Sequence, residues 1–489
     1  MKTKKLFAAA YIAIASSCLM SCNEDKVEYL PPQTIKNTAL TSVLKEKGYS
    51  FNADGKLEMN DKVFQTTSLD LSNTGLTDLK DLSVFPNLNE IKLSNNNYGA
   101  VFDFDNIPAS ITSVDLSGNN IYDFEHLVDA VEENNAPLVK SVRPIKKLVL
   151  PETAKYNIED VVVLYLTKGK EVDLQMADKT GKIMPYNTIR EIPDAGLASY
   201  LKSIYGSLFV DDTHIDISKQ PVLREQGESI GLAYPVDVTK IKSLEGLEYF
   251  INNPFSRPCK FVVMGEFANN SLSYLMPRGN ASALIMPHVN IKAGLDCSKA
   301  TNLLFLDLNG CDGVTKLDLQ HTRMFNITDK DLPLIELPFL KVTKCPNLEE
   351  VLLPNKGDVI IKELFIGNAP KLKTLDLSAV STIQKLVLGT ENTMLTLPNI
   401  TRVVSSEDEN MMEAFRKGFD IHRATAAKIW HEDMENVTDT QRKKAKQANF
   451  GIIYGITTYG LAQRMDIPNG EAKELIDGYF NTFPKVKAY

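Results

Sequence analysis

Short segments of the form apolar–polar–apolar recur along the first part of the chain. Three of them lie about 22 residues apart, at 69–71, 91–93 and 114–116. Alternation with a period of two predicts short strands that have one buried face. A strand of this length cannot bury its apolar face alone, so we expect these strands to stack on one another.

A second array of short strand-like segments, some with a polar and some with an apolar central residue, follows further along the chain. Its members are residues 306–308, 317–319, 351–353, 364–366, 375–377 and 386–388, and some of them lie only about 11 residues apart. In the first array Thr74, Asn96 and Asn119 follow the strands at a fixed offset, where such side chains can bond free backbone groups at a turn. This L-x-L-x-x-N-x-L pattern resembles the leucine-rich-repeat family. The resemblance implies a solenoid of short strands, irregular turns and helical caps.

The hydrophobic pattern changes after about residue 404, where spacing typical of helices replaces the strand-like segments. The predicted helices span 407–417, 421–430, 438–454 and 470–480, and Thr438 and Asp439 offer N-cap chemistry to the third.

Four side chains of that third helix, Arg442, Lys446, Phe450 and Tyr454, lie four residues apart and share one broad face. The two cations can hold a triphosphate and the two aromatic rings can stack on a base. The same spacing also fits an amphipathic helix with a solvated cationic edge and an aromatic core edge.

The sequence of residues 442–455 matches the pattern R-x3-K-x3-F-G-x2-Y-G. The flanking segments 407–430 and 460–489 resemble the same family. This stretch resembles the fingers of family-A DNA polymerases. The resemblance implies that Arg442, Lys446 and His422 contact the phosphates of an incoming deoxynucleotide. It also implies that Phe450 packs on the nucleotide, that Tyr454 guards the templating site, and that DNA is a partner.

Polymerases of this family use magnesium held by aspartates for phosphoryl transfer. One aspartate lies in a D-Y-S-x-x-E segment shortly before the matched region, but residues 393–398 of this chain contain no acidic side chain. The second lies in a His-Asp-Glu segment beyond the fingers, which is not present before Tyr489. We therefore expect no catalytic residue, no bound magnesium and no polymerase activity.

Composition adds two constraints. A net charge of -8 over 489 residues argues against a protein built throughout to coat nucleic acid. The last four cysteines, Cys259, Cys297, Cys311 and Cys345, have no zinc-site spacing, so we expect buried thiols, with a disulfide only if the chain is exported.

The N-terminus carries lysines, then an apolar run, then small residues up to Cys22, as a secretory signal does. Its end resembles a bacterial lipobox, which implies a lipid on Cys22 and a membrane-bound protein of the outer membrane or cell surface. An ordinary cleaved signal with an incidental cysteine is the alternative. A polymerase-like segment would instead belong in the cytoplasm, so we interpret the chain as a chimera of two unrelated parts.

The predicted fold class is mixed, with a leucine-rich-repeat solenoid followed by an all-α polymerase fingers fragment. We expect five units along the chain. The first three are a lipoprotein signal peptide (1–22), a helical cap with the first repeats (23–130) and a strand-rich insertion (131–188). The last two are a second cap with repeats (189–400) and the fingers fragment (401–489). The repeats are expected to bind a protein or a glycan. Residues 52–61 fit either the start of a calcium loop or a plain Asx turn.

Overall fold

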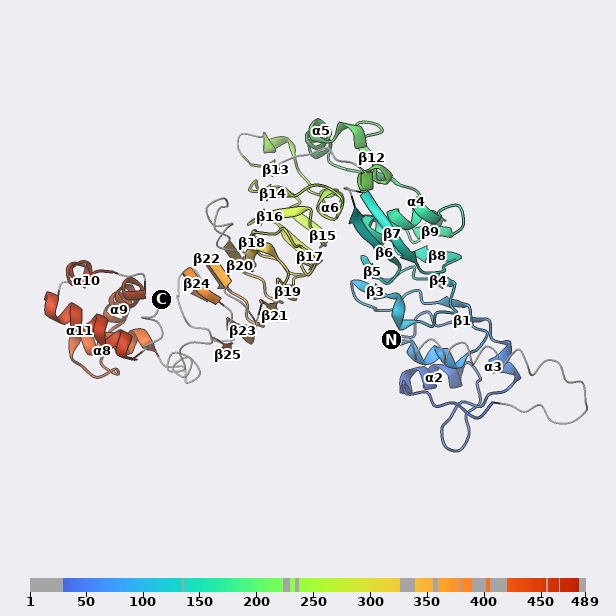
Figure 1. Ribbon diagram of the computed structural model, residues 1–489, viewed down its shortest axis with the longest axis horizontal. Coiled ribbons are helices and arrows are strands. Elements are labelled where there is room, and N and C mark those ends of the chain that lie inside the picture. Colours follow the sequence, from blue (N-terminus) through green and yellow to red (C-terminus); the bar gives the residue numbers. More distant parts are fainter. Residues whose placement is uncertain are drawn as a thin grey trace, which may run out of the picture.

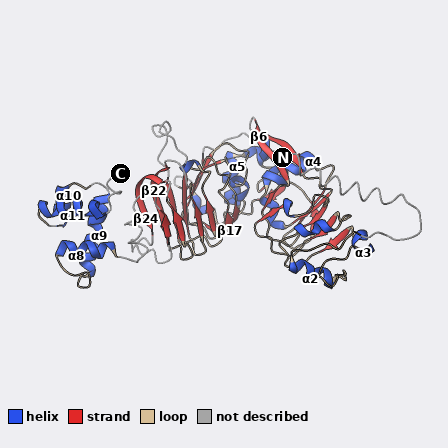
Figure 2. Cartoon of the chain, turned by 60° about the horizontal axis from the view of Figure 1, so that its bottom comes forward, coloured by secondary structure: helices blue, strands red, loops and turns tan. Residues whose placement is uncertain are grey.

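The computed structural model describes residues 30–133, 136–222, 229–233, 237–325, 339–354, 359–377, 380–388, 402–404, 420–453, 456–465 and 467–482. Strands dominate the part of the chain before residue 405, and the described elements after it are helices (Figure 1, Figure 2). Within these ranges, none of the helices combines the length and the apolar character that crossing a membrane requires.

The first sheet has the strand order β1-β2-β4-β8-β9-β10. Its strands are β1 (Ser68–Asp70), β2 (Glu90–Lys92), β4 (Ser113–Asp115), β8 (Lys147–Leu150), β9 (Asp173–Ala177) and β10 (Ile183–Pro185). Strands β1 to β9 of this sheet run parallel, and Leu69, Ile91 and Val114 lie opposite one another and are buried. The alternating segments therefore form the predicted short strands, stacked so that their apolar faces share one core.

Asparagine side chains join successive turns of this sheet. Asn96 Nδ2 donates to the carbonyl oxygens of Leu71, at 3.0 Å, and Leu93, at 2.9 Å. Asn119 Nδ2 donates in the same way to Leu93, at 3.0 Å, and Leu116, at 2.8 Å. Asn119 Oδ1 accepts from the backbone N–H of Asn96 at 2.8 Å, which links one turn to the next. The prediction that these side chains bond free backbone groups is confirmed, since buried carbonyls need such donors.

Further elements surround the first sheet. They are α2 (Thr38–Glu46), α3 (Asp61–Gln65), η1 (Lys80–Val84), η2 (Phe104–Asn106), the parallel pair β3 (Val101–Asp103) and β5 (Asp123–Glu125), the antiparallel hairpin β6 (Val128–Glu133) and β7 (Ala136–Val142), η3 (Glu152–Tyr156), the π-helical turn η4 (Ile158–Val162) and α4 (Val163–Lys168). Before α3, Asn52 Oδ1 accepts from the backbone N–H groups of Asp54 and Lys56, which is the geometry of an Asx turn. The calcium alternative for this loop stays a prediction.

The second part of the chain carries a seven-stranded parallel sheet, a four-stranded parallel sheet and a parallel pair. The seven strands are β13 (Ser229–Leu232), β14 (Cys259–Val263), β16 (Ala281–Met286), β18 (Phe305–Asn309), β20 (Phe339–Thr343), β22 (Val359–Gly367) and β24 (Val380–Leu388). The four are β19 (Lys316–Asp318), β21 (Glu350–Leu352), β23 (Thr374–Asp376) and β25 (Arg402–Val404), and the pair is β15 (Ser271–Leu275) with β17 (Asn290–Leu295).

The remaining elements of this part are the antiparallel pair β11 (Ile189–Glu191) and β12 (His214–Asp216), the helices α5 (Ala195–Ile204) and α6 (Glu248–Ile251), and the turns η5 (Gly206–Leu208), η6 (Ile217–Val222), η7 (Val238–Lys240) and η8 (Arg323–Phe325). The core contains Cys259, Cys297, Cys311 and Cys345, all free and buried. The prediction of buried thiols is confirmed.

The predicted fold class is wrong in two respects. The chain is a mixed α/β protein whose strands lie in separate parallel sheets, in place of the expected leucine-rich-repeat solenoid. From β18 to β25 successive strands alternate between the seven-stranded and the four-stranded sheet, which is the reason for the short spacing of about 11 residues. The last strand of the first sheet, β10, runs antiparallel to β9.

The second error concerns residues 401–489, which are not all-α. Strand β25 pairs in parallel with β23, with Val403 opposite Leu375, and adds a fourth strand to that sheet. Consecutive β-branched valines favour an extended backbone, and the open edge of β23 offers hydrogen bonds to it. The helical part of the region is α8 (Ile421–Trp430), α9 (Asp439–Ile453), α10 (Thr458–Met465) and α11 (Asn469–Thr482). The helix expected at 407–417 lies outside the described residues.

Candidate functional site

Helices α8 and α9 pack against each other through small side chains. Ala426, Ala445 and Ala448 are fully buried in this contact, and alanine allows two helix backbones to approach closely. Leu461 and Tyr479, from α10 and α11, belong to the same hydrophobic cluster. Among the described residues, the members of this cluster all come from the four helices and the segments that join them, so these helices have a core of their own.

Asp420 precedes α8 and serves two helices at once. Its Oδ1 accepts from the backbone N–H of Arg423 at 3.0 Å, which caps the N-terminus of α8. Its Oδ2 accepts from Nε of Arg442 in α9 at 2.6 Å. Burial acts to raise the pKa of Asp420, but these two donors and the charge of Arg442 prevail and lower it. The carboxylate is therefore a fixed anion that orients Arg442.

The loop between α8 and α9 is held from both ends. Arg423 donates from Nη1 to the carbonyl oxygen of Val437 at 2.8 Å. At the start of α9, the backbone N–H of Thr438 donates to Gln441 Oε1 at 2.8 Å, and the N–H of Gln441 donates to Thr438 Oγ1 at 3.3 Å. This is the reciprocal arrangement of a capping box. Thr438, which the sequence offered as a capping residue, therefore caps the start of α9.

His422 and Asn449 meet across the α8–α9 contact. His422 Nδ1 and Asn449 Nδ2 lie 3.0 Å apart, and both side chains are buried. Burial lowers the pKa of His422 to about 4, with a further contribution from the charges of Arg442 and Lys446 that the carboxylate of Asp420 partly offsets. The imidazole is therefore neutral near pH 7.

Lys446 lies one helical turn beyond Arg442 and is partly buried. Burial, and then the charge of Arg442, lower the pKa of Lys446. The structure thus brings His422, Arg442 and Lys446 into mutual electrostatic range from two helices. The backbone of Phe450 belongs to α9, but its side chain is not among the parts that the structure describes. Tyr454 and Cys22 lie outside the described residues.

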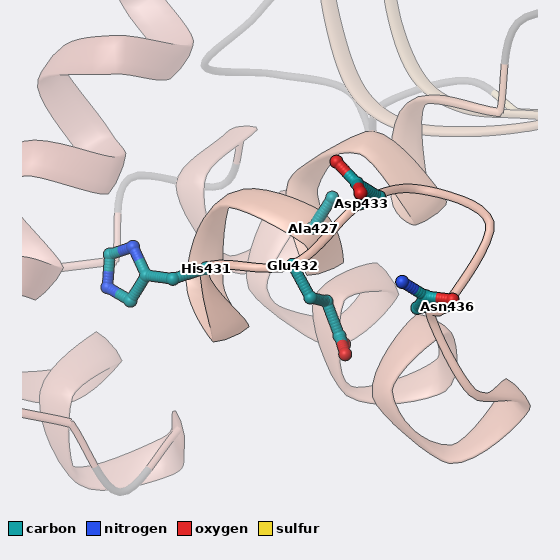
Figure 3. A pocket seen from close by; sticks show the side chains of 5 residues that line it. All are labelled: Ala427, His431, Glu432, Asp433 and Asn436. Carbon is teal, nitrogen blue, oxygen red and sulfur yellow. The ribbon is translucent and has the colours of Figure 1, made fainter.

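A shallow pocket lies beside the α8–α9 loop (Figure 3). Its lining consists of Ala427, His431, Glu432, Asp433 and Asn436. None of these is a predicted nucleotide contact. Two carboxylates among five lining residues disfavour an anionic ligand, because like charges repel. The pocket therefore does not extend the cationic face formed by Arg442 and Lys446.

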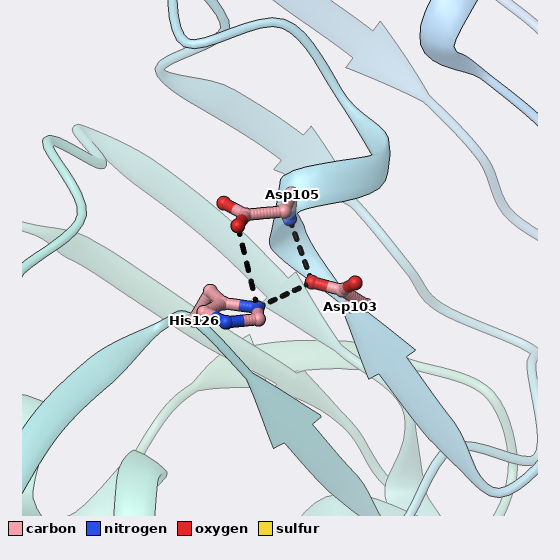
Figure 4. A group of neighbouring side chains, drawn as sticks. All are labelled: Asp103, Asp105 and His126. Atoms are coloured by element: carbon pink, nitrogen blue, oxygen red, sulfur yellow. Dashed lines mark hydrogen bonds and ion pairs between the residues drawn. The ribbon is translucent and has the colours of Figure 1, made fainter. Parts of the chain in front are cut away.

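A second group of polar side chains lies far along the chain from these helices. His126 Nδ1 lies 2.7 Å from Asp103 Oδ1 and 3.6 Å from Asp105 Oδ2 (Figure 4). Imidazole and carboxylates are metal ligands, and this is the single set of three such ligand groups within reach of one another among the described residues. The hydrogen bond to Asp103 raises the pKa of His126. The direct contact between the groups accounts for the geometry without an ion.

Sequence reasoning missed Asp420, Arg423 and Asn449. Asp420 had a readable signal, since an aspartate directly before a predicted helix is an N-cap candidate. Asn449 had none, because an asparagine inside a helix gives no hint of which partner it meets across a helix–helix contact. The predicted nucleotide contacts are thus supported by residues that only the packing of α8 on α9 reveals.

Comparison with known proteins places this helical region in a family. Residues 402–489 match the family model described as DNA polymerase family A. DNA polymerase I of Geobacillus stearothermophilus is 37% identical over 144 residues, which are 29% of this chain and 15% of that protein. DNA polymerase I of Bacillus caldotenax is 51% identical over 84 residues, which are 17% of this chain and 10% of that protein.

Among solved structures, similarity extends to the "POL domain of Pol1 from M. smegmatis complex with DNA primer-template and dNTP". The two chains are 35% identical over 17% of this chain and 14% of the other, with a TM-score of 0.15. This chain spans 15% or less of the length of the two DNA polymerase I relatives. The family-A polymerase region is therefore one segment of a chain whose larger part it does not cover.

Proposed function

We propose that the α8–α9 unit binds the triphosphate of a deoxynucleotide through Arg442, Lys446 and His422. The observation that carries this proposal is the arrangement of these side chains, which approach one another from two helices joined by Asp420. The match of residues 402–489 to DNA polymerase family A supports a nucleotide and DNA as the ligands.

The chemistry of the three groups suits phosphate. Asp420 engages Arg442 through Nε, so the planar guanidinium can direct its terminal nitrogens at a phosphate as a two-pronged donor. Lys446 supplies a compact positive charge one turn away. Arg442 keeps about a quarter of its side-chain surface exposed, at 27%, so its charge is accessible to a ligand. A neutral His422 can add a hydrogen bond without a further charge.

The remaining roles in this proposal rest on the resemblance alone. Phe450 would pack on the nucleotide, and Tyr454 would stand at the templating position of a DNA strand. In the sequence, both residues continue the four-residue spacing of Arg442 and Lys446.

Magnesium does not fit the residues of this region. Residues 393–398 contain no acidic side chain, and among the described residues the one group of three metal-binding side chains lies at Asp103, Asp105 and His126, outside α8–α11. We propose that the chain binds nucleotide without extending a primer, and a primer-extension assay with magnesium and all four deoxynucleotides tests this. Metal-dependent synthesis would contradict it.

Binding itself is tested with the full chain and a fluorescently labelled deoxynucleotide, followed by anisotropy. Arg442→Ala and Lys446→Ala are each expected to weaken binding about tenfold or more, since a charge-assisted hydrogen bond contributes about 1.5–3 kcal/mol. Lys443→Ala and Lys444→Ala are matched controls, because both lysines lie on α9 and are exposed. An equal loss in all four variants would indicate non-specific attraction to a basic helix and would refute the site.

A second candidate function concerns the first 400 residues. We propose an exported, lipid-anchored protein that binds a protein or glycan partner, on the evidence of the lysine-flanked apolar run and Cys22. Labelling of intact cells is expected to reach this part of the chain, whereas purely cytosolic fractionation would contradict the proposal. Recovery from cells of a peptide that spans residues 390–412 would show that the two parts are joined in one chain, and its absence would mean that they are separate proteins.

A further inference from the structure

Cys311 and Cys345 occupy the same place on two successive turns of the seven-stranded sheet. In β18 and β20, Asn309 lies opposite Thr343, and each cysteine follows two residues later. The backbone N–H of Gly310 donates to the carbonyl oxygen of Thr343 at 3.0 Å, so the pairing continues beyond the ends of the two strands. The two cysteines are therefore neighbours across adjacent turns.

The turns that carry the two cysteines have matching backbone conformations. Gly310 and Lys344, the residues directly before the cysteines, both have a positive φ, at 78° and 52°. Neighbouring strands of a sheet lie about 4.8 Å apart. A disulfide joins two Cα atoms that are about 4.4–6.8 Å apart, so equivalent positions on adjacent turns fall within the range that a disulfide requires.

The two thiols also contact each other inside the core. Both side chains are fully buried, and Cys311 Sγ donates to the carbonyl oxygen of Val289 at 3.3 Å, whereas Cys345 Sγ donates to that of Thr343 at 3.5 Å. A hydrogen bond between the two thiols raises the pKa of Cys311, to which burial also contributes, and lowers the pKa of Cys345 against the effect of burial. The two sulfur atoms therefore lie side by side.

Apolar packing alone does not select cysteine at these two positions. The equivalent place is filled by Val289 on the turn before them and by Ala369 on the turn after them. Cysteine can act as a small apolar residue, but two neighbouring thiols differ from aliphatic side chains in that they can be joined by a covalent bond.

We propose that Cys311 and Cys345 form a disulfide that fastens these two turns of the sheet to each other. The bond forms by exchange with an external disulfide, either a small molecule or an oxidoreductase. One cysteine thiolate attacks a sulfur atom of that disulfide and expels the other half as a thiol. The second cysteine thiolate then attacks the mixed disulfide, which closes the Sγ–Sγ bond and releases the remaining half. The two cysteines are oxidised, and the external disulfide is reduced to two thiols that take up the two protons.

The burial of both thiols determines when this exchange takes place. Because the folded core excludes a reagent, we expect the bond to form while the chain folds. The bond does not involve the proposed nucleotide site, which lies in the C-terminal helices. Disulfides persist in oxidising compartments, which the proposed export of the first 400 residues would provide. The test uses purified protein, so its result does not depend on whether the chain is exported.

The linkage is measured by mass spectrometry of the full chain after refolding. Reduced protein is unfolded in urea, refolded in a mixture of reduced and oxidised glutathione, and treated with iodoacetamide to block the remaining thiols. Trypsin then releases Cys311 in peptide 300–316 and Cys345 in peptide 345–356, each with no other cysteine. We expect these two peptides to be joined, with the sum of their masses less two hydrogen atoms. Blocked thiols at both positions, or a bond from either one to another cysteine, would overturn the inference.

Thermal unfolding tests whether the bond fastens the two turns. Addition of a reductant to the refolded wild type is expected to lower the midpoint, followed by far-ultraviolet circular dichroism, by about 5–10 °C, because the bond restricts the unfolded chain. Cys345→Ala is the matched control, since Ala369 occupies the equivalent place on the next turn, and the reductant is expected to leave its midpoint unchanged. A midpoint that the reductant lowers equally in both proteins, or in neither, would overturn the inference.

Discussion

Replacement of Arg278 by methionine tests how a buried ion network joins the two sheet-bearing parts of the chain. The guanidinium contacts three carboxylates: Nε lies 2.7 Å from Glu159 Oε2, Nη1 lies 2.9 Å from Asp296 Oδ2, and Nη2 lies 3.0 Å from Asp123 Oδ2. Asp123 belongs to β5 and Glu159 to the π-helical turn η4, whereas Asp296 follows β17. One side chain thus holds together segments that lie more than a hundred residues apart in sequence.

The expected cost follows from the exposure of the partners. The side chains of Arg278 and Asp123 are 5% and 4% exposed, so neither is solvated by water. Glu159 and Asp296 are about a quarter exposed, at 26% and 24%, and can regain solvent when the arginine is removed. Removing one member of a buried ion pair costs roughly 3–5 kcal/mol, because the remaining charge stays buried and unpaired. We expect Arg278→Met to lose about 3–5 kcal/mol at pH 7 on this ground.

The cost depends on pH in a defined direction. Burial alone would raise the pKa of Glu159 and of Asp296, but Arg278 lowers both. A lowered carboxyl pKa contributes stability above the unfolded value, and this stability is lost as the pH falls through the folded value. Burial raises the pKa of Asp123, and loss of Arg278 would raise it further, so the variant can escape its unpaired charge by binding a proton. The difference between the two proteins is therefore expected to be full at pH 7 and to shrink below about pH 5.

The assay must report on the sheets. The single tryptophan of the chain, Trp430, lies in α8, so its fluorescence follows the C-terminal helices instead. Urea unfolding monitored by far-ultraviolet circular dichroism, with hydrogen exchange of the segments around Glu159 and Asp296, reads the relevant region. Lys299→Met is the matched control, since Lys299 lies 3.9 Å from Glu159 and is 54% exposed, and it is expected to cost less than about 1 kcal/mol. Equal stability of Arg278→Met and wild type at pH 7 would refute the reasoning.

Three further predictions follow from local contacts. Thr438→Ala removes one side of the capping box and is expected to destabilise the helical cluster by about 0.5–2 kcal/mol, read from the fluorescence of Trp430 during urea unfolding; an unchanged midpoint would contradict the cap. Asn96→Ala removes the oxygen that accepts from the backbone N–H groups of Thr74 and Gly75 and is expected to cost about 1–3 kcal/mol, measured by thermal unfolding; a loss below the error of the measurement would argue against the asparagine ladder. The contact with Asp103 raises the pKa of His126, so its stabilisation is fully present below pH 6.5 and is lost as the pH rises through the folded pKa. Because His126 is more than half exposed, His126→Gln is expected to cost less than about 1 kcal/mol at pH 6 and nothing at pH 9, and a cost that grows with pH would be the contrary result.

Sequence reasoning was most successful where a pattern is local. Helices 421–430, 438–454 and 470–480 correspond to α8, α9 and α11, since capping residues and apolar spacing act within one or two turns. The strands at 69–71, 91–93 and 114–116 form for the same reason. Helix α10 was missed, because only two buried apolar residues and one alanine mark its eight residues.

The sequence by itself determined that short strands stack, that asparagines bond their turns, and that the C-terminal helix carries Arg442 and Lys446 on one face. Each of these depends on spacing of a few residues. Only the tertiary structure decided that successive strands divide between two sheets, that β25 joins the second of them, and that Asp420 contacts Arg442 and Asn449 contacts His422. These features depend on contacts between residues that lie far apart in the sequence. Such contacts are selected by burial and by strand pairing, and the spacing of neighbouring residues does not encode them.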